Sequence, residues 1–150
     1  MQYQAFVCGD VLSIAGVQIE VLPAHHTVPA VGFAVEGDTG WWVFSGDTER
    51  NPAFWTRVNL LSVVCLVIET AFSDRESDLA CRSLHLSPAT LAQELANVPV
   101  TQRYPIYITH TKPSETSLIM NEIRQLECTA IERHGPHDIR WLVAGQTLEI

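Results

Sequence analysis

Basic residues and long apolar runs are scarce in this sequence, and each scarcity argues against a class of protein. The chain has 9 lysine and arginine residues against 17 acidic ones, which gives a formal net charge of -8. Such a surface repels nucleic acid phosphates unless a local patch or bound cation reverses its sign, so we expect no nucleic acid partner. No apolar run approaches the ~20 residues that a membrane-spanning helix needs, so we expect no membrane partner.

Closely spaced cysteines and a leader pattern are also missing. The four cysteines, Cys8, Cys65, Cys81 and Cys128, show no Cys-x-x-Cys spacing. Cys65 lies in the apolar segment Leu60–Ile68 and is expected to be an inert core residue. The segment up to Phe6 has no basic stretch followed by an apolar one, so we expect no signal peptide. Together these features predict a cytoplasmic protein with reduced thiols.

The apolar segments predict a sheet with strands of two kinds. The chain has 150 residues and 47% hydrophobic content, which suits one domain over residues 1–150. Val17–Leu22 alternates apolar and polar residues, as a strand with one buried face does. Val63–Ile68 is continuously apolar, which is typical of a strand buried on both faces. The other predicted strands are Ala5–Cys8, Val11–Ile14, Gly32–Glu36, Trp41–Ser45, Ile106–Thr109, Ile139–Val143 and Gln146–Ile150.

Three segments predict helices. Asn51 caps a helix that reaches Asn59, with Pro52 at its first position. Ser87 caps a second helix ending near Asn97, and Ser114–Leu126 is the third. Residues 69–86 are expected to form a long loop. Strands followed by alternating helix and strand predict an α/β fold whose mixed sheet carries helices on one face.

Two polar side chains directly follow predicted strands. Asp47 follows the apolar segment that ends at Phe44, and His110 follows Ile106–Thr109. A carboxylate and an imidazole, each at a strand end, suit a hydrolytic metal site. The alternative for Asp47 is an ordinary Gly-Asp-Thr turn in which its side chain caps the next helix.

Glu69 and His85 are further candidates. Glu69 ends the most apolar strand, where an unpaired carboxylate would be costly to bury, so it is either exposed or held by a partner. It could also orient a histidine that binds metal. His85 precedes the helix capped by Ser87 and could contact a phosphate or donate a proton. A loop histidine with no partner is the alternative.

The remaining candidates lie in loops. His26 follows a strand in a loop shaped by Pro29, although a histidine pair in a loop is often only a surface feature. Lys112 could place positive charge beside His110. His134 and His137 are expected to lie in a surface loop and not to bind metal.

These motifs, taken in order, resemble a known family. They are the Pro23–Phe33 segment around His26, Ser-Gly-Asp-Thr at Asp47, Ile-Glu-x-x-Phe at Glu69, His-Leu-Ser-Pro at His85 and Thr-His-x-Lys-Pro at His110. Their order over residues 23–113 resembles the metallo-β-lactamase superfamily. Within it, the His85 and His110 motifs are most similar to the class II cyclic-nucleotide phosphodiesterases, with ribonuclease Z as a related group.

The resemblance implies an αββα sandwich with two metals at the sheet edges. It implies that Asp47 bridges the metals, that His110 is a terminal ligand, and that His85 transfers a proton or contacts phosphate. His26 would support the site. The implied substrate is a phosphodiester such as a cyclic nucleotide, attacked by a metal-activated hydroxide. Zinc and manganese both suit such ligands.

One motif of that family is absent. The sequence contains no His-x-His-x-Asp-His cluster, which supplies ligands in the family's first half. We therefore expect this chain to be the C-terminal half of the sandwich and to be weakly active or inactive by itself. The alternative is a non-catalytic half-sandwich that binds a ligand or pairs as a homodimer. A third reading is an unrelated α/β domain in which Asp47 and His110 coincide by chance.

Overall fold

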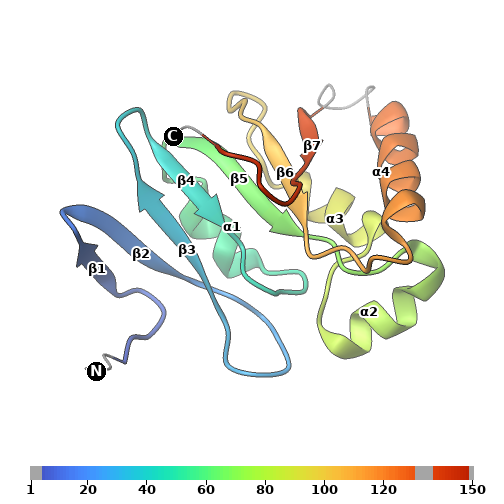
Figure 1. Cartoon of the computed structure of the whole chain (residues 1–150), viewed down its shortest axis with the longest axis horizontal. Helices are drawn as coiled ribbons and strands as arrows, with labels where there is room; N and C mark the ends of the chain where they lie inside the picture. Colours follow the sequence, from blue (N-terminus) through green and yellow to red (C-terminus); the bar gives the residue numbers. More distant parts are fainter. Residues whose placement is uncertain (1–4, 131–136, 149–150) are drawn as a thin grey trace.

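One mixed sheet forms the centre of the structure. The computed structural model describes residues 5–130 and 137–148, and there it has a seven-stranded sheet in the order β1-β2-β3-β4-β5-β6-β7. Neighbouring strands are antiparallel from β1 to β4 and parallel from β4 to β7. The strands, shown in Figure 1, are β1 (Val11–Ile14), β2 (Val17–Pro23), β3 (Val31–Glu36), β4 (Trp41–Phe44), β5 (Val63–Glu69), β6 (Ile106–Thr109) and β7 (Ile139–Trp141).

Helices connect the parallel strands. They are α1 (Pro52–Val58), α2 (Ser77–Ser83), α3 (Pro88–Leu95) and α4 (Thr116–Ala130). The predicted caps of two helices are confirmed: the Asn51 side chain accepts a hydrogen bond from the Phe54 amide, and Ser87 forms a capping box with Thr90. Among the residues that the structure describes, no helix has the length and apolar character of a membrane span.

Both predicted terminal strands are wrong where the structure describes them. Ala5–Cys8 forms no strand: the Asp10 carboxylate accepts a 2.8 Å hydrogen bond from the Val7 amide, Gly9 adopts φ +91°, and of residues 5–10 only Gly9 and Asp10 pair with β2, through Val21. At the other end, Gln146 folds back on Val143 through its backbone and side chain, so residues 146–148 form no strand. Residues 149–150 of the predicted strand lie outside the described residues.

The predicted loop over residues 69–86 is also wrong in part. It contains a 3-10 turn, Asp74–Glu76, followed directly by α2. Ala80 is the only fully buried residue of α2, whose sequence is otherwise mostly polar. The helix therefore lacks the apolar stripe from which a helix is recognised in a sequence.

The two faces of the sheet differ in what covers them. On one face, α1, α3 and α4 pack residues such as Trp55, Leu91 and Ile119 onto strand residues such as Leu66 and Ile108, as predicted for helices on one side. On the other face lies a smaller apolar cluster that contains no helix residue. Its buried members are Cys65, Val67 and Tyr107, and its partly buried members are Trp42, Phe44, Leu142 and Leu148.

Candidate metal-binding site

The candidate residues follow the ends of strands that run in the same direction. Because β2 is antiparallel to β3 and β3 to β4, β2 runs parallel to β4, β5 and β6. The carboxyl ends of these strands therefore meet at one edge of the sheet (Figure 1). His26, Asp47, Glu69 and His110 lie at or just after those ends. This edge is where open α/β sheets commonly bind ligands.

A glycine places Asp47 at this edge. Gly46 has φ +65°, and a Cβ added to it would lie 2.3 Å from the Val31 carbonyl oxygen. Gly32, on the facing strand, would place a Cβ 2.6 Å from the Phe44 carbonyl oxygen. Only glycine allows these two backbones to approach so closely at that turn. The close approach directs the chain from β4 into the loop that carries Asp47.

Asp47 and His110 lie at ion-pair distance. His110 Nε2 is 3.8 Å from Asp47 Oδ2, and their side chains are 44% and 39% exposed. His110 has φ +61°, an uncommon conformation for a residue with a side chain. A carboxylate and an imidazole suit Zn²⁺ or Mn²⁺, but metal sites in proteins usually have about three or four protein ligands. The described residues contain no group of three or more His, Cys, Asp or Glu residues that could hold a metal ion.

Glu69 is fully buried and its carboxylate is fully engaged. Its Oε1 accepts hydrogen bonds from the Thr48 amide at 3.0 Å and from His85 Nδ1 at 2.7 Å. Its Oε2 accepts bonds from the Ala71 amide at 3.1 Å and the Leu86 amide at 3.3 Å. These donors offset the cost of burying the charge. Of the two alternatives for Glu69, the structure therefore selects a carboxylate held by partners.

The hydrogen bond between Glu69 and His85 determines which ring nitrogen of His85 carries a proton. A carboxylate only accepts hydrogen bonds, so His85 Nδ1 is the donor and carries a proton. The hydrogen bond to Glu69 raises the pKa of His85 above its ordinary value, against the effect of burial; the charges of Glu69 and Asp47 also raise it, and that of Lys112 lowers it. His85 is therefore a loop histidine with a strong partner, and Glu69 stabilises its protonated form.

Three imidazole rings lie together at the edge. The His26 ring is 4.7 Å from the His85 ring, which stacks on His110 at 5.3 Å. His26 Nδ1 also donates to the Leu84 carbonyl oxygen at 3.1 Å. Leu84 ends α2 with φ +54°. Both His26 and His85 are thus held through Nδ1, which is how partners commonly orient a histidine for a metal or a substrate.

All of the predicted site residues lie near one another. Lys112 Nζ lies 4.9 Å from the centre of the Phe72 ring, and this ring is 5.7 Å from that of His85. Asp47 and Lys112 both contribute to the pKa of His85. The edge therefore holds His26, Asp47, Glu69, His85, His110 and Lys112.

The sequence did not reveal three contributors to this site. They are the Thr48 amide, the Phe72 ring and the Leu84 carbonyl. Backbone groups carry no sequence signal, and the Ile-Glu-x-x-Phe motif alone does not indicate that Phe72 lies against His85. His25 forms a 3.7 Å contact with Glu49 away from the ring cluster, with its side chain 57% exposed. His134 lies outside the described residues.

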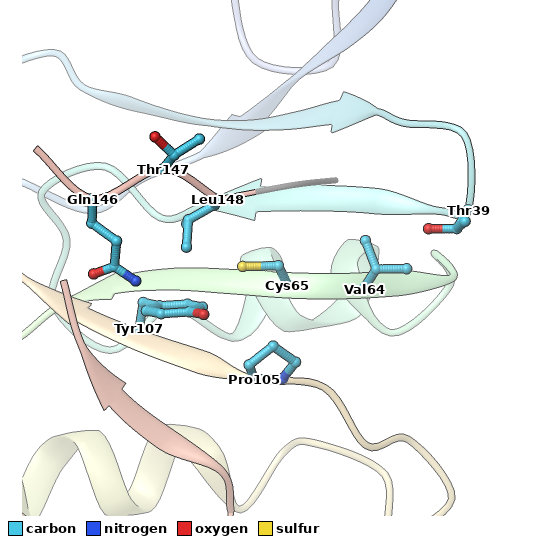
Figure 2. A pocket seen from close by; sticks show the side chains of 8 residues that line it. All are labelled: Thr39, Val64, Cys65, Pro105, Tyr107, Gln146, Thr147 and Leu148. Atoms are coloured by element: carbon cyan, nitrogen blue, oxygen red, sulfur yellow. The ribbon is translucent and has the colours of Figure 1, made fainter.

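A separate cavity lies on the sheet face opposite α1, α3 and α4. It has a volume of about 570 Å³ and is lined in part by Cys65, Tyr107 and Leu148. Figure 2 shows Cys65 and Tyr107 on the sheet beneath the segment that carries Gln146 and Leu148. Burial raises the pKa of the Cys65 thiol to about 11, so it stays protonated near neutral pH. This cavity does not contain the candidate catalytic groups.

Comparisons with known proteins identify the fold. No family model matches the chain, and no curated protein matches its sequence. Among solved structures, the metallo-β-lactamase fold protein YhfI from Bacillus subtilis is similar with a TM-score of 0.75 and 13% identity, over 97% of this chain and 55% of that chain. Unliganded yeast PDE1 is similar with a TM-score of 0.71 and 16% identity, over 94% and 48%. The short form of human tRNase Z has a TM-score of 0.53 and 17% identity, over 66% and 37%.

The predicted fold class is confirmed by these similarities. The chain has an α/β fold with a mixed sheet, as in metallo-β-lactamase fold proteins, and it spans about half the length of the solved structures it resembles. A Zn²⁺-bound PqqB from Methylobacterium extorquens is also similar, with a TM-score of 0.63 and 14% identity over 98% of this chain and 52% of that chain. Divalent metals therefore occur among proteins of this fold.

Proposed function

We propose that this chain is one half of a metal-dependent phosphodiester hydrolase of the cyclic-nucleotide phosphodiesterase type. The observation that carries the proposal is the gathering of Asp47, His110 and the Glu69–His85 pair at one sheet edge, with Asp47 and His110 3.8 Å apart and Glu69 and His85 2.7 Å apart. The similarity in fold to yeast PDE1 is consistent with this substrate class. The net charge of -8 disfavours a nucleic acid substrate.

Asp47 and His110 would hold the metal. Both side chains are partly exposed and offer the oxygen and nitrogen donors that Zn²⁺ or Mn²⁺ accepts. When bound, a divalent metal would lower the pKa of water and offset phosphate charge. Asp47 follows β4, which lies between β2 and β5 in the sheet. His26 follows β2, and Glu69 is the last residue of β5. This central position would suit a carboxylate shared between two metals.

Glu69 and His85 would act on the leaving group. Glu69 fixes the Nδ1–H tautomer and stabilises a second proton on the ring of His85. His85 Nε2 has no hydrogen-bond partner among the described residues, so it is available to a substrate. Glu69 stabilises the imidazolium form of His85. In that form, His85 can donate a proton to the departing oxygen of a phosphodiester.

Half of the site would come from elsewhere. Two protein ligands hold zinc more weakly than the roughly three or four that zinc sites usually have. The sequence also has no His-x-His-x-Asp-His cluster to supply further ligands. No helix of the described residues packs on the sheet face with Trp42, Phe44 and Val67, and this face would pack against a complementary half. We therefore expect this half to lack efficient activity until the complementary half is present. The compartment we propose is the cytoplasm.

The test is hydrolysis after complementation. The chain would be co-expressed with a half-domain that contains His-x-His-x-Asp-His, and cleavage of cyclic nucleotides and of bis(p-nitrophenyl) phosphate would be measured with Zn²⁺ and Mn²⁺. We expect activity only in the pair, and a loss of about a hundredfold or more in His85→Asn. A matched control is His25→Asn, because His25 lies outside the ring cluster. An active pair in which His85→Asn and His25→Asn behave alike would contradict the assigned role.

A non-catalytic, self-pairing module is the second candidate, and one observation favours it. The apolar face around Cys65, Val67 and Tyr107 could be covered by the same face of a second copy. Mass in solution distinguishes the two candidates. A metal-free homodimer that the complementary half does not displace would favour the self-pairing module.

A further inference from the structure

Lys112 is unusual in this chain because it is the only lysine. The other eight basic side chains are arginines. The backbone of Lys112 is held on both sides, since its amide donates to the Ala71 carbonyl at 3.1 Å and its carbonyl accepts from the Glu115 amide at 2.9 Å. The single lysine is therefore fixed between the end of β5 and the start of α4, two residues after His110.

The ammonium group of Lys112 has no carboxylate partner among the described residues. Its nearest charged neighbour along the chain, Glu115, instead accepts hydrogen bonds from Arg75 and from the Ser73 amide. Lys112 Nζ lies over the Phe72 ring at 4.9 Å and the residue is exposed. A contact of this kind at an exposed position is weak, so it orients the ammonium group without neutralising it.

Several arginines differ in this respect. Arg50, Arg57, Arg75 and Arg140 each form an ion pair with a carboxylate. Lys112 is thus an uncompensated cation, and it lies beside the rings of Phe72 and His85 in a chain whose net charge is -8. A local positive charge in an acidic protein attracts anions to that one place.

We propose that Lys112 binds the anionic oxygens of the substrate phosphate and selects charged phosphodiesters over neutral esters. The inference rests on the function proposed above and names the group that recognises the substrate. An ammonium is a compact point charge with three donors, which suits a non-bridging phosphate oxygen. Lys112 Nζ and the His85 ring both lie next to the Phe72 ring, and the charge of Lys112 acts on His85, so we expect one phosphate to contact both.

The single lysine makes a direct test possible. Acetylation by an N-hydroxysuccinimide ester would be timed by mass spectrometry of the peptide that contains residue 112, without metal. Dimethyl phosphate, which is anionic, would be compared with trimethyl phosphate, which is neutral and similar in shape, at constant ionic strength. A ligand at twice its Kd should slow the reaction about threefold. We expect dimethyl phosphate to protect Lys112 and trimethyl phosphate not to protect it.

The control is Arg82→Lys, which adds one amine on the exposed surface of α2. Dimethyl phosphate should leave acetylation at position 82 unchanged while slowing it at Lys112. Equal rates at Lys112 with the two phosphates, or equal protection at both positions, would overturn the proposal. Because the readout needs neither metal nor hydrolysis, protection together with an inactive complemented pair would reject the proposed function alone. Activity without protection would reject only the role of Lys112.

Discussion

Two buried carboxylates in this structure have similar surroundings but different partners. Glu94, on α3, is 3% exposed and accepts hydrogen bonds from the Asn51 amide at 2.9 Å, Trp55 Nε1 at 2.8 Å and Arg50 Nε at 3.3 Å. Glu69 is 0% exposed and binds three backbone amides and His85. Both are saturated with donors, as buried charges must be.

The two carboxylates differ in whether one of their hydrogen-bond donors can gain or lose a proton near neutral pH. None of the groups that Glu94 holds titrates near neutral pH, so Glu94 joins α1 to α3 and contributes stability. Glu69 holds a histidine, the side chain that titrates in that range, and this histidine faces two others. Burial of a carboxylate alone therefore does not indicate function; a titrating partner at a strand end does.

The largest expected effect is on the Glu94 side of this comparison. Glu94→Ala leaves the indole and the Asn51 amide without an acceptor and leaves Arg50 unpaired. We expect a loss of about 3–4 kcal/mol in the free energy of unfolding, measured in urea. Glu36→Ala, at an exposed position, is the control and should change it by less than about 0.5 kcal/mol. A loss for Glu94→Ala as small as that control would mean that this carboxylate is not a structural anchor.

Next in size is the Glu69→Gln substitution. The amide places a donor against backbone amides that need an acceptor, so we expect a loss of about 2 kcal/mol in stability. The pKa of His85 should also fall toward its ordinary value, as followed by NMR titration of the ring. Glu94→Gln should destabilise the protein but leave the pKa of His85 in place. A fall of that pKa in both variants would contradict the comparison.

A smaller effect concerns pH. Since the hydrogen bond to Glu69 raises the pKa of His85 above 6.5, the stability from this pair is fully present below about pH 6.5 and is lost as pH rises through the raised value. The stability advantage of the wild type over His85→Gln should therefore shrink between pH 6 and pH 9 in urea unfolding. An advantage that stays constant or grows with pH would show that Glu69 does not favour the charged imidazole.

The smallest effect is expected at Arg50. Its side chain is 51% exposed, so water and salt screen its pair with Glu94. Arg50→Ala should lower the free energy of unfolding by about 0.5 kcal/mol or less in urea, and 0.5 M salt should remove most of the difference. A loss comparable to that of Glu94→Ala would show that the ion pair, not the two neutral donors, anchors Glu94.

The residues at the strand ends could be predicted from the sequence, whereas Glu94 and the helix α2 could not. Asp47, Glu69 and His110 were found because each follows an apolar strand, and strands that run in the same direction end at the same edge. Glu94 was not singled out because its partners lie about 40 residues away, with no local pattern to connect them. The helix α2 was missed because its residues are mostly polar and exposed. The segment Ala5–Cys8 looks like a strand, but the Asp10 carboxylate accepts a hydrogen bond from the Val7 amide and holds this segment in a turn.

The most direct test of the account is Zn²⁺ binding by the purified chain, measured by isothermal titration calorimetry. Wild type, Asp47→Asn, His110→Gln and Glu94→Gln would be compared at the same pH. We expect weak binding of Zn²⁺ at this edge, weakened about tenfold or more by Asp47→Asn and by His110→Gln and unchanged per folded molecule by Glu94→Gln. Binding that is absent, or equal in all four proteins, would contradict a metal site formed by Asp47 and His110.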